Sequence, residues 1–514
     1  MSLNLAHFLE RSAQTHTSKT ALSHDGVLTS YTQLATNVRK VAHILREHGV
    51  RKGDKVVVML PNVPAFTTIY YGILTLGAVV VPINHMLKSH EIAYCLEDSD
   101  AKVFFAWRDF GKEAFKAFGE TETCHHLIVV NPHGADEKPP VGQLLEELLD
   151  GASDIFAMEQ TMPDDTAVIL YTSGTTGHPK GAELTHFNMF FNALITKDHV
   201  ACIDDSDIAL AILPLFHSFG QTCIQNACVL AGATICMMSS FDPKRVLQVI
   251  RQEKISYVAA VPAMYTFLLQ MARNEEAPFA GLRAAISGGS SLPVEILKQY
   301  KEKYDLQIYE GYGLSETSPV ASFNIRTRKC KPGSIGLPIW GCNMAVMRED
   351  GTLADVDEIG EIVIQGHNVM KGYYNKETAT REAIVDGWFH TGDMARMDAE
   401  GYFFIVDRKK DLIIRGGLNV YPREIEDVLY GHPAILEASV VGIPKNMGGE
   451  EEVWAFVVLK QGMEATSKEI RGYCNERLAS FKCPKRVEIV DALPKGPTNK
   501  ILKRELRNWR ASQG

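Results

Sequence analysis

The residues best suited to chemistry lie in the segment Tyr171–Gly181, which reads YTSGTTGHPKG. Its glycines leave room beside the backbone, its hydroxyl groups are hydrogen-bond donors, and Lys180 adds a positive charge. Successive backbone N–H groups in such a loop form a concave site that binds anions. The segment therefore predicts a phosphate-binding loop. It is not a Walker loop, because Gly177 is followed by His178 and Pro179 instead of directly by a lysine and a hydroxyl residue.

Six further segments combine glycine, hydroxyl and charged residues. They are LPLFHSFG (213–220), SGGSSLP (287–293), YEGYGLSETSP (309–319), GWFHTGD (387–393), GYFFIVDRKKDLIIRGGLNVYPREIE (401–426) and PTNKILKREL (497–506). In type and order, these segments and the loop at 171–181 resemble the adenylate-forming superfamily of acyl-CoA synthetases, nonribosomal peptide adenylation domains and beetle luciferases. The resemblance covers the chain from its first third onward. The words NVMKGYYN and DRKKDLIIRGGLNVYPREIE look most like bacterial fatty-acid–CoA ligases.

The resemblance implies two half-reactions. The carboxylate of an acid displaces pyrophosphate from ATP to give an acyl-adenylate, and the thiol of coenzyme A then attacks the activated carbonyl and releases AMP. An anion attacks a polyanion in the first step, so preorganised positive charge lowers that barrier most effectively. By resemblance, Lys500 bridges the carboxylate and the α-phosphate, although a lysine in this charged segment would otherwise be read as a solvated surface residue. Asn499 stands where glycine is usual, and asparagine tolerates left-handed backbone better than most residues.

The resemblance also implies an ATP site. The phosphate loop comprises Thr172, Ser173, Gly174, Thr175, Thr176, Gly177 and Lys180. The rest of the nucleotide site comprises Gly288, Gly289, Ser290, Glu310, Gly311, Tyr312, Gly313, Ser315, Asp393, Ile405, Arg408 and Lys500. Tyr312 is expected against the adenine, and Asp393, which only accepts hydrogen bonds, on the ribose hydroxyls. Ser315 replaces a more usual threonine and keeps the hydroxyl for the α-phosphate.

The remaining roles also follow from the resemblance. Glu316 holds Mg²⁺, a hard cation that suits carboxylate and phosphate oxygens. The implied catalytic set is Lys500, Thr175, Glu316 and His217, and the implied acid pocket is His217, Phe219, Gly313 and Val320. Lys410 is the expected hinge, and Gly416 and Gly417 are expected to border the tunnel for the pantetheine arm of coenzyme A.

These segments must be positioned by an α/β fold. Helical and strand-like segments alternate through the first four hundred residues, for example a helix over 31–48, a strand over 55–60, a helix over 243–253 and a strand over 256–261. This alternation predicts largely parallel sheets. After about residue 350, short strands separated by turns predict an antiparallel or barrel-like portion. We therefore expect a composite N-terminal domain over 1–409 and a small, mobile α+β lid over 410–514.

The stretch from Phe66 to Leu87 is apolar and as long as a membrane span. Gly72, Gly77 and Pro82 interrupt it, and its second half reads as a β-branched strand. A buried helix followed by a buried parallel strand explains the same apolarity. We expect no integral membrane segment, and peripheral membrane contact is left open.

Composition limits the classes of function. The 514 residues are 46% hydrophobic and 22% charged, which is typical of soluble globular chains. A formal net charge of -9 gives no global attraction to nucleic acid, so none is expected as a partner. The ten cysteines form no CxxC pair, and the N-terminus lacks the pattern of a secretory signal. A reduced cytoplasm is expected, and a monomer or a homodimer is left open.

The expected substrates are ATP, coenzyme A and a carboxylic acid with an apolar tail, because the segments around His217 and Val258–Pro262 offer apolar residues and no partner for an ammonium. A medium- or long-chain fatty acid is preferred. Four alternatives stay open: an aryl or coumarate-type CoA ligase, a fatty acyl-AMP ligase serving a carrier protein, a luciferase-like oxidation that uses the same first step, and a catalytically silent nucleotide-binding protein.

Overall fold

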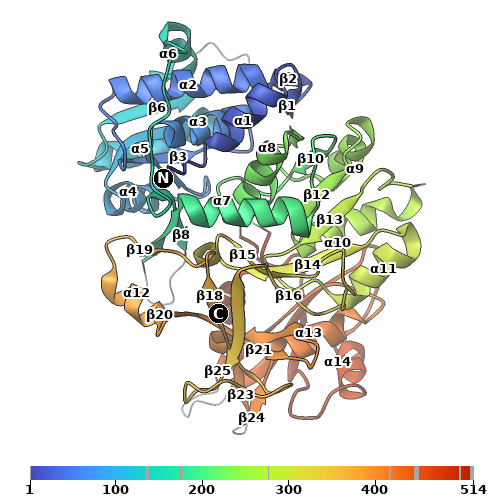
Figure 1. Ribbon diagram of the computed structural model, residues 1–514. Coiled ribbons are helices and arrows are strands. Elements are labelled where there is room, and N and C mark those ends of the chain that lie inside the picture. Colours follow the sequence, from blue (N-terminus) through green and yellow to red (C-terminus); the bar gives the residue numbers. More distant parts are fainter. Residues whose placement is uncertain are drawn as a thin grey trace.

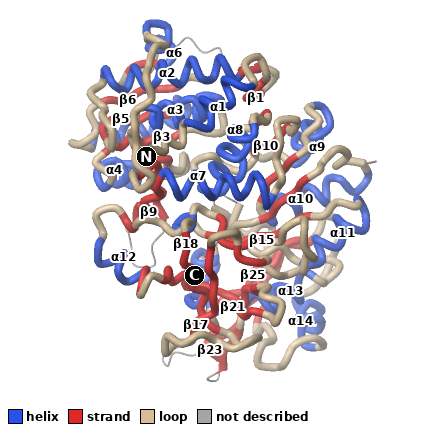
Figure 2. Tube along the Cα trace, viewed as in Figure 1, coloured by secondary structure: helices blue, strands red, loops and turns tan. Residues whose placement is uncertain are grey.

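The computed structural model describes residues 2–132, 138–172, 178–275, 277–415, 418–444, 451–496 and 499–509. Within these residues, two large sheets flanked by helices form most of the N-terminal part, and a smaller α+β unit follows at the lower edge of Figure 1. Figure 2 shows the strands running through the middle of the molecule with helices on the outside. The predicted α/β class is confirmed.

One large sheet has eight strands in the order β19-β9-β8-β4-β3-β5-β6-β7. Its strands are β3 (Lys55–Met59), β4 (Val79–Pro82), β5 (Ala101–Trp107), β6 (His126–Val130), β7 (Gln143–Leu144), β8 (Thr166–Thr172), β9 (Lys180–Thr185) and β19 (Gly372–Tyr373). The pairs from β7 across to β8 are parallel, whereas β9 runs antiparallel to β8 and β19 antiparallel to β9. Both ends of the predicted phosphate loop are therefore held in this sheet, Thr172 at the end of β8 and Lys180 at the start of β9.

The second large sheet has nine strands in the order β16-β15-β14-β13-β12-β10-β11-β1-β2. Its strands are β1 (Thr20–His24), β2 (Val27–Ser30), β10 (Ile208–Ala211), β11 (Thr234–Met237), β12 (Tyr257–Ala260), β13 (Ala284–Ser287), β14 (Ile308–Gly313), β15 (Val320–Phe323) and β16 (Leu337–Pro338). The central pairs from β1 to β14 are parallel. Parallel strands present their carboxyl ends on one edge of the sheet, which is where α/β proteins bind ligands.

In the part of the chain that the structure describes, eleven α-helices accompany the two sheets. They are α1 (His7–Thr15), α2 (Tyr31–Glu47), α3 (Pro64–Thr75), α4 (Ser89–Asp98), α5 (Gly111–Glu120), α6 (Leu145–Gly151), α7 (His186–Ile195), α8 (Ala227–Ala231), α9 (Pro243–Gln252), α10 (Pro262–Met271) and α11 (Val294–Tyr304). Local sequence sets several of these ends. Ser30 and Gln33 form a capping box at the start of α2, and Asp242 caps α9 ahead of a proline in its first turn.

The apolar stretch at 66–87 is the expected helix and strand. Helix α3 is buried on nearly every side, Gly77 follows it with a φ of 72°, and β4 is fully buried. A helix that is apolar all round belongs in a core, so burial between sheets accounts for this composition. Among the helices of the described ranges, none combines the length and apolarity that a bilayer span needs.

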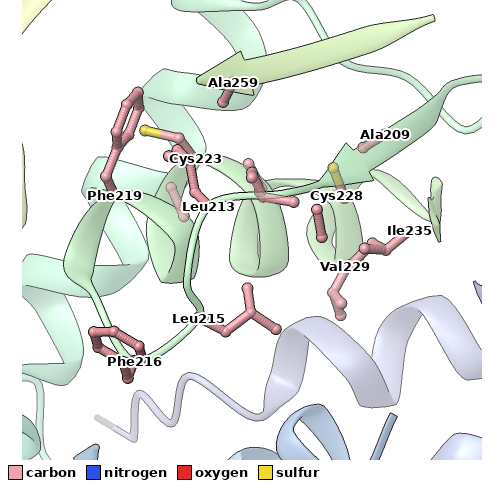
Figure 3. Close-up of a cluster of buried hydrophobic side chains, with 14 of the residues drawn as sticks. Ala209, Leu213, Leu215, Phe216, Phe219, Cys223, Cys228, Val229, Ile235 and Ala259 are labelled. Atoms are coloured by element: carbon pink, nitrogen blue, oxygen red, sulfur yellow. The ribbon is translucent and has the colours of Figure 1, made fainter. Parts of the chain in front are cut away.

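The loop that follows β10 and carries His217 is held in place by side chains that pack in the hydrophobic core. Figure 3 shows Leu213, Leu215 and Phe216 along the loop that follows β10, with Phe219 and Cys223 along the helical segment after it. These side chains are buried, and they belong to one cluster with Ala259 of β12. The loop is therefore anchored on both sides of His217 by apolar packing.

The antiparallel portion expected after residue 350 is a five-stranded sheet. It consists of β17 (Cys342–Met347), β18 (Gly360–Gly366), β20 (Ile384–Val385), β21 (Trp388–Met397) and β22 (Phe403–Arg408), with α12 (Glu377–Ala383) beside it. Its buried core residues join the same cluster as those of the large sheets.

The small unit has its own core. It contains β23 (Ile413–Arg415), β24 (Leu418–Val420), α13 (Pro422–Tyr430), β25 (Ile435–Pro444), β26 (Glu451–Leu459), α14 (Ser467–Asn475), β27 (Arg486–Ile489) and α15 (Lys503–Arg507). Its buried apolar residues begin at Ile413 and form clusters separate from the core that ends at Phe403. The domain boundary at residue 410 stays a prediction, and these separate cores agree with it.

Candidate active site

A cavity of about 1530 Å³ lies where the two large sheets, the antiparallel sheet and the small unit meet. Pockets for single small molecules usually measure about 300–1,000 Å³. The cavity is therefore large enough for a nucleotide together with a second substrate.

Most of the predicted site residues line this cavity. They are Thr172, Lys180, His217, Phe219, Gly288, Gly289, Ser290, Gly311, Tyr312, Gly313, Ser315, Glu316, Val320, Asp393, Arg408, Lys410 and Lys500. Ser173, Gly174, Thr175, Thr176, Gly177, Gly416 and Gly417 lie outside the described residues. The structure thus brings together residues that are up to 328 positions apart in the chain, from Thr172 to Lys500.

Asp393 is the centre of a polar triad. The Tyr312 hydroxyl donates to Asp393 Oδ2 at 2.6 Å, and Arg408 Nε lies 3.1 Å from Asp393 Oδ1. Strands β21 and β22 place Asp393 directly opposite Arg408. A buried carboxylate is tolerated when it is paired and hydrogen-bonded. Each carboxylate oxygen accepts more than one hydrogen bond, so Asp393 keeps capacity for hydroxyl groups of a ligand.

Lys500 reaches the cavity from a turn at the end of the chain. The Gly496 N–H donates to the carbonyl of Lys500 at 2.8 Å, and Asn499 has a φ of 57°, so asparagine adopts the left-handed backbone expected of it. Loss of surrounding water, followed by the positive charge of Arg408, lowers the pKa of Lys500 to about 8. The ammonium group borders the cavity.

His217 is a neutral donor in this setting. Its Nδ1 accepts the Phe219 N–H at 3.2 Å, which leaves the proton on Nε2. Burial, followed by the charge of Lys500, lowers the pKa of His217 to about 4. The imidazole therefore donates a hydrogen bond at neutral pH and is poorly suited to act as a general base.

Tyr373, which was not predicted as a site residue, contacts both Glu316 and Lys180. The Tyr373 hydroxyl donates to Glu316 Oε1 at 3.1 Å, and Lys180 Nζ lies 5.2 Å from the centre of the Tyr373 ring. Tyr373 belongs to the segment NVMKGYYN, which in the sequence indicated only a resemblance to bacterial fatty-acid–CoA ligases. Its contact with Glu316 depends on β19 pairing with β9, which a local pattern does not reveal.

The end of the cavity where the acid pocket is predicted is apolar and closely packed. Phe219 and Val320 are almost fully buried, and both line the cavity. A side chain at Gly313 would place its Cβ 1.7 Å from the carbonyl oxygen of Pro319, and one at Gly311 would meet the Phe323 ring at 2.0 Å. Only glycine fits at these two positions.

Two predicted nucleotide residues do not line the cavity. Glu310 is buried, its Oε1 accepts the Leu292 N–H at 2.9 Å, and its carbonyl accepts the N–H of Asn324. Burial raises the pKa of Glu310 to about 7. Ile405 packs against the core, and its carbonyl accepts Arg423 Nη1 at 2.7 Å. Core packing and these hydrogen bonds hold both residues outside the cavity lining, and their contact with the nucleotide stays a prediction.

Lys410 lies in a short 3₁₀ turn, Lys409–Asp411, between β22 and β23. Both units contribute contacts around it. Arg423 of α13 donates to the carbonyl of Ile405, and Arg507 of α15 pairs with Asp411 at 2.6 Å. The predicted hinge position is therefore a connection between two units that also touch through side chains.

Comparison with known proteins is consistent with this geometry. The sequence model described as AMP-binding enzyme matches residues 9–374, and the one described as AMP-binding enzyme C-terminal domain matches residues 424–500. The chain belongs to the AMP-binding enzyme family. Together with its curated relatives, this membership shows an AMP-forming acyl-CoA synthetase.

The relatives of this acyl-CoA synthetase act on different acids. A long-chain-fatty-acid–CoA ligase of Bacillus subtilis (strain 168) is 36% identical over 527 residues, covering 98% of this chain and 94% of the relative. A feruloyl-CoA synthase of an Amycolatopsis species is also 36% identical, over 493 residues and 95% of each chain. Ligation of an acid to coenzyme A is supported, and the comparisons leave the acid undecided.

Solved structures match the whole synthetase. ATP-bound MatB from Rhodopseudomonas palustris is 31% identical and superposes with a TM-score of 0.90, with 99% of each chain covered. The apo form of the same protein gives a TM-score of 0.81 over 99% of each chain at 30% identity. The chain therefore superposes better on the ATP-bound form than on the apo form.

Proposed function

We propose that this synthetase activates a medium- or long-chain fatty acid as an acyl-adenylate, uses Mg²⁺·ATP, and transfers the acyl group to coenzyme A. The observation that carries the choice of acid is the apolar end of the cavity. Leu213, Phe216, Phe219 and Val320 line it, and within 213–219 the titratable side chain is His217, which is neutral. An apolar tail gains free energy by leaving water there, at about 25 cal/mol per Å² buried.

The proposed roles follow from the contacts. Asp393 accepts the ribose hydroxyls while Arg408 and Tyr312 hold it in place. Lys500 supplies positive charge where the carboxylate and the α-phosphate approach each other, and the Nε2–H of His217 donates to an oxygen of the acid. Preorganised charge of this kind contributes most when charge develops in a site partly shielded from water.

The donor set fits Mg²⁺ bound together with ATP. Among the described residues, no group of three or more His, Cys, Asp or Glu side chains could hold a metal by itself. Glu316 instead offers one carboxylate in the cavity wall. Mg²⁺ is commonly bound by one or two carboxylates plus substrate phosphates, which matches this arrangement. When bound, the ion neutralises part of the phosphate charge, and Ser315 and Lys180 line the same region.

The second half-reaction requires a different face of the small unit. We propose that the unit turns about Lys410, withdraws Lys500, and brings Gly416 and Gly417 to the pantetheine arm. Rearrangements of this kind gate many enzymes. The contacts of Arg423 with Ile405 and with the carbonyl of Gly333 would break in that turn. All ten cysteines are free, in keeping with a reducing compartment such as the cytoplasm, where we propose that the enzyme acts.

A panel of acids tests the substrate. The purified enzyme is given ATP and Mg²⁺, with or without coenzyme A, and fatty acids of increasing length or aryl acids such as ferulate. Pyrophosphate release and acyl-CoA formation are then measured. Turnover that rises with chain length and is weak for ferulate supports the proposal. The feruloyl-CoA synthase relative makes an aryl acid the second candidate, and preferential turnover of ferulate would select it.

A further inference from the structure

Tyr373 lies between two charged groups that come from different elements. Its hydroxyl donates to Glu316 Oε1 at 3.1 Å, and the Lys180 ammonium lies 5.2 Å from the centre of its ring. Glu316 is in the 3₁₀ turn Ser315–Thr317, whereas Lys180 begins β9. One side chain thus contacts the proposed metal ligand through its polar end and the phosphate-loop lysine through its ring.

The backbone around Tyr373 is fixed by hydrogen bonds to both elements. The Met370 N–H donates to the carbonyl of Glu316 at 2.8 Å, and the Tyr374 N–H donates to the carbonyl of Gly181 at 2.8 Å. The Tyr373 N–H donates to Thr380 Oγ1 at 2.9 Å. The segment therefore ties the Glu316 turn of one large sheet to β9 of the other, and it leaves Tyr373 little freedom to move.

We propose that Tyr373 is a positioning residue whose hydroxyl orients the Glu316 carboxylate for Mg²⁺ and whose ring orients Lys180 for the ATP phosphates. The inference rests on the proposed role of Glu316 in holding the metal. A hydrogen bond to one carboxylate oxygen fixes the plane of the group, and outer partners of this kind affect metal affinity by about 10–100-fold. Contact with a ring face attracts an ammonium and limits its rotamers.

The chemistry of Tyr373 suits this role. A tyrosine hydroxyl has an ordinary pKa of about 10, so a phenol is a neutral hydrogen-bond donor at neutral pH. A neutral hydroxyl donates a hydrogen bond to the Glu316 carboxylate and leaves its negative charge in place, whereas a cationic side chain would neutralise that charge. The metal and its phosphates therefore still meet a charged carboxylate.

The test separates the hydroxyl from the ring. Tyr373→Phe removes only the hydroxyl, and Tyr373→Leu removes the ring as well. Tyr374→Phe is a matched control on the next residue, because the Tyr374 hydroxyl bonds to Lys55 and Asp100 and that residue does not line the cavity. Glu316→Gln tests the metal site itself. Each folded protein is titrated calorimetrically with ATP, in Mg²⁺ and in excess EDTA, with no acid present.

Loss of the Tyr373 hydroxyl should affect Mg²⁺ binding, and loss of the Tyr373 ring should affect the position of Lys180 and so the binding of ATP. Tyr373→Phe should raise the Mg²⁺ concentration at half-saturation about tenfold and leave the metal-free ATP affinity unchanged. Tyr373→Leu should in addition weaken metal-free ATP binding, and Tyr374→Phe should match the wild type. A Tyr373→Phe protein with normal Mg²⁺ dependence, beside a Glu316→Gln protein that has lost it, overturns the inference and leaves the proposed function standing. Normal Mg²⁺ dependence in both overturns the inference together with the proposed metal site.

Discussion

Replacing Lys500 by alanine should separate the two half-reactions. The ammonium lies in the cavity among Arg408, Asp393 and Lys410, whose charges all affect its pKa. Loss of one preorganised donor to a developing charge costs about 10²–10³ in rate, or about 3–4 kcal/mol of barrier. Because Arg408 and Lys410 remain, we expect the lower part of this range for adenylate formation. Transfer from preformed acyl-AMP to coenzyme A should change by less than about twofold, because the proposed turn about Lys410 withdraws Lys500 before that step.

The assay measures each step by itself. Acid-dependent exchange of labelled pyrophosphate into ATP reports the first step, and acyl-CoA formation from synthetic acyl-AMP reports the second. Arg504→Ala is the control, since Arg504 is an exposed cation in the same segment that does not line the cavity. Equal losses of adenylate formation and of acyl-CoA formation in Lys500→Ala would refute the proposal that Lys500 acts only in the first half-reaction.

Three further predictions follow from the same site. The kcat/KM for ATP should fall as pH rises through about 8, because Lys500 loses its charge there, and Lys500→Arg should remove this alkaline limb from the pH–rate profile. Asn499→Gly should keep the adenylation rate, whereas Asn499→Val, which meets the φ of 57° with a β-branched side chain at a cost of about 1–3 kcal/mol, should lower it in single-turnover measurements. Val320→Trp should fill the apolar end of the cavity, so the KM for palmitate should rise far more than that for hexanoate, with the KM for ATP unchanged.

Local patterns predicted the elements, whereas the resemblance to the adenylate-forming superfamily named the candidate site residues. The β-branched run at 55–60 forms β3, and the apolar stretch after Phe66 divides into α3 and β4 at Gly77. The motif segments lie at the ends of strands and in the turns between them. Their side chains therefore meet in one cavity although they are far apart in the chain. The resemblance named these segments, and their meeting agrees with a fold in which the carboxyl ends of parallel strands share an edge.

Other features depended on contacts that no local pattern encodes. Tyr373 meets Glu316 because β19 joins β9 in another sheet, nearly two hundred residues away in sequence. Glu310 belongs to a motif word, yet its carboxylate turns to the Leu292 N–H because that side of β14 is buried. A motif therefore indicated which segments meet and did not indicate which side of a strand each residue faces.

In the proposed first half-reaction, the acid carboxylate attacks the α-phosphate of ATP in this cavity. This step is tested most directly with palmitate labelled in both carboxylate oxygens, turned over with ATP, Mg²⁺ and coenzyme A, with the products analysed by mass spectrometry. We expect one labelled oxygen in AMP, none in pyrophosphate, and one retained in the acyl-CoA. Label in pyrophosphate or in free phosphate, or formation of palmitoyl-CoA with unlabelled AMP, would contradict it.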